Sequence, residues 1–171
     1  MAIGNSNRLV KFILIYLPII LLFVSVLNEF DFNYLGIKYF SFNFSYILIF
    51  YYSLKRNKSL GYGLIFIAGL FNDVVSGNLM GISSLNFLLL CGFAAYLRNI
   101  TLSPSLLKDW MFFLITISVI NSLSFILMTF IFDSPMNYFD LVVNTLFTFL
   151  FYFIFSLLFD KFEQRFIGKL E

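Results

Sequence analysis

Histidine is absent from this 171-residue sequence, and cysteine occurs once, at Cys91. Without these ligands and nucleophiles the chain cannot form a zinc cluster, a haem site, a Cys–His nucleophile or an internal disulfide. The sequence also lacks a P-loop, a dinucleotide-binding glycine fingerprint and a nucleophile elbow. We therefore expect a protein that is not an enzyme and that carries no cofactor and no metal.

Charged residues are scarce as well. Lys and Arg number 11, Asp and Glu number 9, and together they make up 12% of the chain. A soluble domain usually has about twice that share. The basic residues are scattered along the sequence rather than collected in one stripe, so nucleic acid is not an expected partner.

Apolar residues dominate the composition. They make up 61% of the chain, with 26 Phe and 10 Tyr, and the mean hydropathy is +0.94. One water-soluble core cannot hide so many apolar side chains, so lipid must be the solvent for much of the surface. At about 20 residues per spanning helix, the chain has room for six or seven spans but not for a separate catalytic domain. We predict an all-α membrane protein with a single domain over residues 1–171.

The apolar stretches predict a bundle of six transmembrane helices. The stretch nearest the N-terminus follows Arg8 and Lys11 as a signal peptide would, but no small-x-small cleavage site follows it, so an uncleaved anchor is favoured over a cleaved signal. The predicted spans are residues 12–28, 37–54, 60–76, 82–97, 110–132 and 138–159, and a tail at 160–171 follows them.

The basic residues predict the orientation of this bundle. Ten of the 11 Lys and Arg residues fall on the side of the N-terminus, and only Lys38 falls on the other side. The positive-inside rule therefore places both termini in the cytoplasm. In the tail, Phe159, Phe162 and Phe166 alternate with basic residues, which predicts a helix along the cytoplasmic headgroups, with a cytosolic docking helix as the alternative.

Asp73 is an ionisable residue inside the third predicted span. Gly61, Gly69, Asp73 and Ser76 fall on one narrow helical face, which is expected to pack against another helix. We expect the Asp73 carboxylate to accept hydrogen bonds from amides around residues 81–84 and so to fix the hairpin. A substrate site, a proton site and a direct contact with another protein are the alternatives.

Polar side chains also occur in the fifth and sixth predicted spans. Ser118, Asn121 and Ser122 share a helical face, and Asn144 lies in the sixth span. We interpret these residues as contacts between helices of the bundle or with a partner subunit, each hydrogen bond contributing about 1 kcal/mol. They are too few to line a hydrophilic permeation path.

The segment GLFNDVVSGNLMG at residues 69–81 resembles the bacterial rod shape-determining protein family MreD. In that family a Gly-x-x-x-Asp-x-x-Ser-Gly-x-x-x-Gly segment is the most recognisable feature. The resemblance extends to YYSL at residues 51–54, to Trp110 and to Val143-Asn144. The matching motif positions are Gly69, Asp73, Ser76, Gly77 and Gly81.

This resemblance implies a membrane subunit of the cell-wall elongation machinery in the bacterial inner membrane. The implied partner is MreC and, through it, MreB, RodA and the class B penicillin-binding protein, with membrane lipid around the bundle. The resemblance also implies a fold similar to the substrate-binding subunits of energy-coupling-factor transporters, so capture of a vitamin or metal ion is the alternative function. A capture subunit needs several polar side chains around an outward cavity, and the chain offers few beyond Asp73, so a scaffold is favoured.

Overall fold

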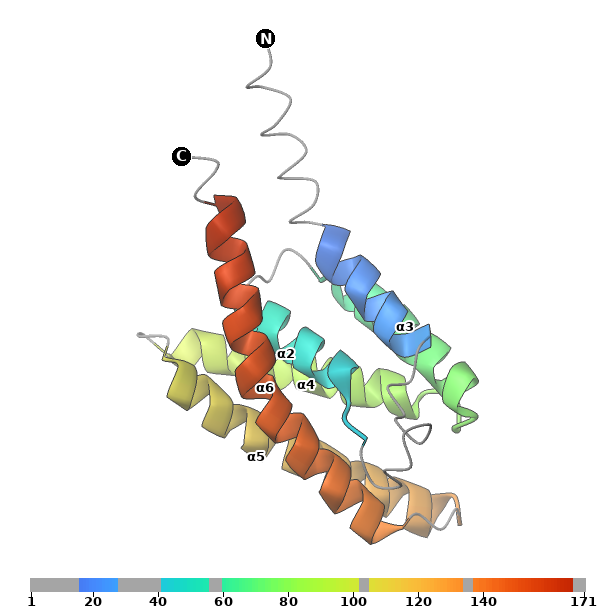
Figure 1. The fold of residues 1–171 in the computed structure, drawn as a ribbon. Helices are drawn as coiled ribbons and strands as arrows, with labels where there is room; N and C mark the ends of the chain where they lie inside the picture. Colours follow the sequence, from blue (N-terminus) through green and yellow to red (C-terminus); the bar gives the residue numbers. More distant parts are fainter. Residues whose placement is uncertain (1–15, 28–40, 56–59, 102–104, 134–136, 168–171) are drawn as a thin grey trace.

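The computed structural model describes residues 16–27, 41–55, 60–101, 105–133 and 137–167. Regular secondary structure within these residues is helical, as the composition predicts. The helices are Tyr16–Leu27, α2 (Phe44–Lys55), α3 (Tyr62–Ser76), α4 (Ile82–Ile100), α5 (Leu106–Ile126) with its π-helical continuation η2 (Leu127–Ile131), and α6 (Tyr138–Ile167) (Figure 1).

Helix α2 forms the core of the bundle. Every residue from Ser45 to Leu54 is buried, which fits a helix with apolar residues on all sides. The Phe50 ring lies 5.0 Å from Phe113 of α5 and 5.7 Å from Tyr152 of α6, measured between ring centroids. Aromatic packing against α2 therefore joins helices that are far apart in the sequence.

The other helices pack in chain order around this core. Helix α3 packs on α4, α4 on α5 and α5 on α6, while α2 contacts both α4 and α6. Helices α5 and α6 are antiparallel: Trp110 near the start of α5 stacks on Phe149, with the centroids 4.4 Å apart, and Phe125 near its end meets Tyr138 at the start of α6. The indole N–H of Trp110 also donates to the Phe149 carbonyl at 2.9 Å.

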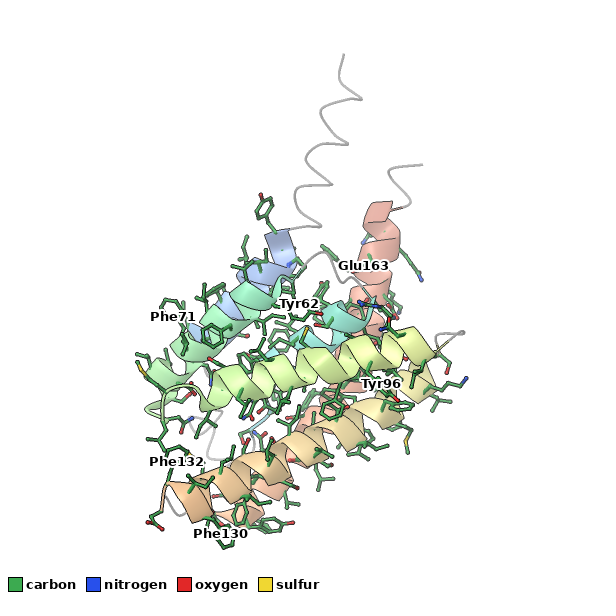
Figure 2. All side chains as sticks on the ribbon, turned by 180° about the vertical axis from the view of Figure 1, so that it is seen from behind. Tyr62, Phe71, Tyr96, Phe130, Phe132 and Glu163 are labelled. Carbon is green, nitrogen blue, oxygen red and sulfur yellow. The ribbon has the colours of Figure 1, made fainter. Side chains whose placement is uncertain are left out.

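The outer surface of the bundle is apolar. By length and composition, two helices are suited to cross a membrane, Leu106–Ile131 and Tyr138–Arg165. Large apolar side chains point away from the bundle in Figure 2, among them Phe130, which is 76% exposed, and Tyr96, which is 63% exposed. Contiguous apolar surface of this kind is unfavourable in water and favourable against lipid acyl chains.

The second predicted span, 37–54, is longer than the helix that the structure describes there. Helix α2 starts at Phe44, and residues 37–40 lie outside the described part of the chain. The Asn43 side chain accepts a hydrogen bond from the Tyr46 amide at 3.3 Å, as an N-cap residue does, and this contact marks the helix start. Because α2 has 12 residues, it is only about 18 Å long, shorter than the hydrocarbon core of a bilayer.

The predicted span 138–159 and the first part of the predicted tail belong to one helix. Helix α6 continues through the expected tail to Ile167 instead of breaking before a separate surface helix. Two contacts with α2 hold the continuation in line. The Phe159 ring lies 5.1 Å from the Tyr51 ring, and the next residue, Asp160, forms an ion pair with Lys55. Residues 168–171 lie outside the described part of the chain.

Candidate interaction site

Two glycines form the turn between α3 and α4. Gly77 has φ +66° and Gly81 has φ +103°, values that side chains other than glycine rarely allow. The Gly77 and Asn78 amides both donate to the Asp73 carbonyl, the second at 2.9 Å, and so close the end of α3. The chain then reverses within a few residues and brings the start of α4 beside the end of α3.

The Asp73 carboxylate holds this turn together. Asp73 is 0% exposed. One carboxylate oxygen accepts the Gly81 amide at 2.7 Å, and the other accepts the Ser83 amide at 2.9 Å. Both donors belong to the start of α4, where amides have no partner within the helix. This is the hydrogen bonding expected from the sequence, and it makes Asp73 a structural residue of the hairpin.

Gly69 lets α3 and α4 approach closely. A Cβ atom placed at Gly69 would lie 2.4 Å from the Cα atom and 2.6 Å from the amide nitrogen of Ser84. The Ser84 hydroxyl donates to the Phe66 carbonyl at 3.0 Å across the same contact. Glycine is therefore required here because the neighbouring backbone of α4 occupies the space of a side chain.

The small-residue face predicted on α3 is only partly covered by α4. Gly69 and Asp73 are buried, whereas Gly61 is exposed, and a Cβ atom added to it would meet no atom within 4 Å. Ser76 is half-buried. Helix α4 therefore covers this face at Gly69 but not at Gly61, and Gly69 is not available to a separate partner.

The polar residues predicted in α5 and α6 divide into two groups. The Asn121 amide donates to Thr145 of α6 at 2.7 Å, and the Asn144 amide donates to Ser41 at 3.0 Å, so both join segments within the chain. Ser118 and Ser122 are exposed on α5. Asn121 and Asn144 therefore contribute to packing within the bundle. Ser118 and Ser122 form a small polar strip on its surface.

Further polar residues of the fifth and sixth spans make contacts within the bundle, and their partners were not predicted. The buried Ser124 hydroxyl donates to the Asn86 side chain at 2.9 Å, and Thr148 accepts the Asn43 amide at 2.9 Å. In each case the residue types indicated hydrogen bonding. The partners depend on how the helices are rotated, which the spacing within a single helix does not reveal.

A second missed feature is an ion pair between α2 and α6. Lys55 at the end of α2 pairs with Asp160, and the same Asp160 oxygen accepts the Tyr51 hydroxyl at 2.7 Å. The Lys55 ammonium lies 4.9 Å from the centre of the Tyr51 ring. The signal in the sequence was two opposite charges at neighbouring ends of predicted spans. Lys55 was interpreted only as a marker of orientation.

The described residues offer no group of three or more Cys, His, Asp or Glu side chains that could hold a metal ion. The hydrogen-bonded acids described above serve helix ends and helix contacts. Asp73 and Asp160 therefore contribute to packing between helices.

Comparison with known proteins gives one match. The family model described as rod shape-determining protein MreD matches residues 6–162, nearly the whole chain. No curated protein and no solved structure matches. The predicted similarity to the substrate-binding subunits of energy-coupling-factor transporters therefore stays a prediction.

Proposed function

Because the chain belongs to the MreD family of rod shape-determining membrane proteins, we propose that it is a non-catalytic subunit of the bacterial cell-wall elongation complex that binds MreC. Through MreC it is connected to MreB, RodA and the class B penicillin-binding protein, and it supports peptidoglycan synthesis and cell shape. The family match supports the role in cell shape, and the exposed face of α5 supports binding of another membrane protein.

The exposed face of α5 is the observation that carries this proposal. Ser118 and Ser122 lie on it one helical turn apart, and three large apolar side chains continue the same stripe. The exposed members of this α5 stripe are Met111, Ile115, Ser118, Ser122 and Ile126. Helices that associate in lipid favour small residues at the contact, because small residues let the backbones approach.

The short turns of the bundle favour the same kind of partner. The connection from α3 to α4 spans only residues 77–81, so it offers little docking area in water. A partner must therefore make much of its contact within the membrane. We propose that the membrane anchor of MreC packs along the α5 stripe.

We also propose six membrane crossings with both termini in the cytoplasm, on the positions of the basic residues. Two exposed residues test this orientation: Asn78 in the turn after α3 and Asn99 near the end of α4. In a Cys91→Ala background, a cysteine at position 78 will react with an impermeant maleimide on intact cells, whereas one at position 99 will react only after permeabilisation. The reverse pattern would overturn the orientation.

The binding proposal predicts a loss of MreC when the α5 stripe is filled. The double substitution Ser118→Leu and Ser122→Leu should reduce co-purification of MreC roughly tenfold, which corresponds to about 1.4 kcal/mol. Gly92→Leu is the matched control, because Gly92 is exposed on α4 and a Cβ atom added to it would meet no atom within 4 Å. Its substitution should leave MreC binding unchanged.

Depletion of the protein in its host separates this function from its alternative. Rounded cells with normal uptake of vitamins and metal ions are expected. Normal shape and wall insertion together with a specific uptake defect would contradict the proposal and favour solute capture. Equal loss of MreC from the α5 variant and from the Gly92 control would instead refute the assignment of the α5 stripe.

A further inference from the structure

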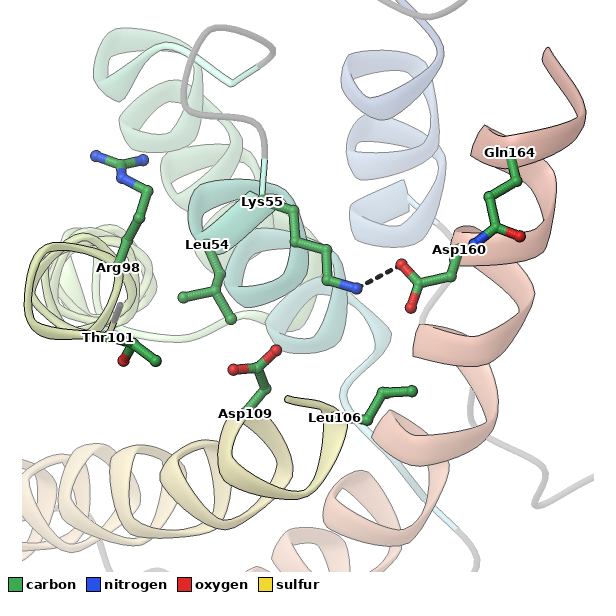
Figure 3. Close-up of a pocket in the computed structure, with 8 residues that line it drawn as sticks. All are labelled: Leu54, Lys55, Arg98, Thr101, Leu106, Asp109, Asp160 and Gln164. Carbon is green, nitrogen blue, oxygen red and sulfur yellow. Dashed lines mark hydrogen bonds and ion pairs between the residues drawn. The ribbon is translucent and has the colours of Figure 1, made fainter. Parts of the chain in front are cut away.

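A cavity of about 550 Å³ opens where the ends of four helices meet. It lies between the ends of α2 and α4, the start of α5 and the C-terminal part of α6 (Figure 3). The residues that line it are Leu54, Lys55, Arg98, Thr101, Leu106, Asp109, Asp160 and Gln164. Leu106 is also the first residue of a helix long enough to span a membrane, so the cavity lies at the edge of the hydrocarbon region, at headgroup depth.

Asp109 is the acidic group of this cavity that has neither an ion pair nor a side-chain hydrogen bond among the described residues. Its side chain lines the cavity although the residue is only 3% exposed. Within the described part of the chain, the Asp109 carboxylate forms no ion pair and accepts no hydrogen bond. A buried carboxylate is costly unless a donor meets it, so a cation or an N–H donor that reached Asp109 would be bound favourably.

Neither basic residue of the cavity forms an ion pair with Asp109. Lys55 forms its ion pair with Asp160. Arg98 donates to the Ser53 carbonyl at 2.9 Å, and its guanidinium group points away from Asp109 in Figure 3. The ammonium of Lys55 has three N–H groups, and its ion pair with Asp160 does not use all of them. The exposed Gln164 carries a side-chain amide beside Asp160. Both residues can therefore donate hydrogen bonds to an anionic group of a ligand.

The charges in the cavity point to the class of ligand. Two acidic side chains, Asp109 and Asp160, stand against Lys55 and Arg98, so the formal charges balance. A ligand with a single charge would leave a net charge in the site, whereas a zwitterion would not. The ligand needs a primary ammonium for Asp109 and an anionic group for the spare donors of Lys55 and Gln164.

We propose that this cavity binds an ethanolamine phosphate group, supplied by the headgroup of phosphatidylethanolamine. The ammonium donates to Asp109, and the phosphate accepts from Lys55 and Gln164. Headgroup depth favours the lipid over a soluble molecule that carries the same group, because the lipid is already concentrated there. This inference depends on the membrane location and not on binding of MreC.

Mass spectrometry of the intact protein in detergent tests the proposal. Given equal amounts of phosphatidylethanolamine, phosphatidylcholine and phosphatidylglycerol, the protein should retain the first. Asp109→Asn should reduce that retention about tenfold, since the oxygen that accepts from the ammonium loses its negative charge. Asp140→Asn is the matched control, because Asp140 is exposed and lies in the first turn of α6. The cavity lies at the other end of that helix, where Asp160 lines it.

A lipid series tests the unsubstituted protein and does not depend on how a variant folds. Retention should fall with each methyl group added to the ethanolamine nitrogen, because each methyl removes one N–H donor. Equal retention across this series, or an unchanged preference in a stably folded Asp109→Asn variant, would overturn the proposal. Binding of soluble phosphoethanolamine as tightly as the lipid would support the headgroup chemistry and identify a soluble source.

A basic side chain of a partner protein is the competing occupant. If the protein showed no lipid preference while Asp109→Asn lost MreC, the carboxylate would receive a partner's Lys or Arg, and the lipid proposal would be wrong. Because the lipid measurement uses the protein without MreC, failure of this inference is distinguishable from failure of the proposed function.

Discussion

Gly69→Ala is expected to lower the free energy of unfolding by about 1–3 kcal/mol, the usual cost of overpacking. The added methyl group would lie 2.4 Å from the Cα atom of Ser84, and that atom belongs to the backbone of α4. A flexible side chain can move aside, but here the whole helix must move. Because the same movement would stretch the hydrogen bonds from the α4 amides to Asp73, the two contacts should weaken together.

Gly63→Ala supplies the control for this experiment. Gly63 lies in the first turn of α3, and a Cβ atom added to it would meet no atom within 4 Å. The substitution should leave stability unchanged or raise it slightly, since alanine favours the helix. Thermal unfolding of both variants in the same detergent gives the comparison. Equal melting temperatures for the two variants would show that α3 and α4 do not approach each other at Gly69.

Asp73→Leu should destabilise the protein more than Asp73→Asn. Leucine leaves the Gly81 and Ser83 amides without an acceptor, at a cost of about 2–4 kcal/mol. Asparagine has one oxygen, so it can accept one of the two amides while its own N–H groups face the other. We therefore expect the order of stability to be wild type, then Asn, then Leu.

Folded yield and thermal stability in detergent measure this order directly. The cell-shape phenotype of each variant should follow its stability, because the carboxylate acts by holding the turn. A variant with Asn at position 73 that is as stable as the wild type but supports no cell shape would contradict this role. Asp73 would then be a contact for a partner or a ligand.

The hairpin could be predicted from the sequence because its determinants are local. Gly77, Gly81 and Asp73 lie within a few residues of one another, and helix periodicity alone places the carboxylate near the following amides. The chemistry of the turn then leaves few alternatives. The same reasoning predicted interhelical contacts for Asn121 and Asn144, although it did not identify their partners.

The core position of α2 could not be predicted in this way. Its sequence is as apolar as that of a lipid-facing span, and burial inside a protein selects the same residues as burial in lipid. The N-cap at Asn43 was a readable signal, since Asn is among the best N-cap residues, but it lay within a stretch already assigned to a helix.

The charged cavity was missed for a different reason. Lys55, Asp109 and Asp160 come from three helices, and their meeting depends on how those helices rotate and tilt. Periodicity describes one helix at a time and carries no information on that arrangement. The sequence indicates that acidic and basic residues gather at one end of the bundle. It does not indicate which acidic residue pairs with which basic residue.

Helix α2 cannot complete its contacts until most of the chain has been synthesised. Asp160 follows its ion-pair partner Lys55 by 105 residues. At about 5–20 residues per second, translation of that interval takes roughly 5–20 s. During this time α2 is too short to span the bilayer by itself, and Lys55 and Tyr51 lack their acceptor. The nascent chain therefore lacks the contacts that join α2 to α6 until translation is nearly finished, and truncation within α6 before Asp160 should lower the stability of the protein.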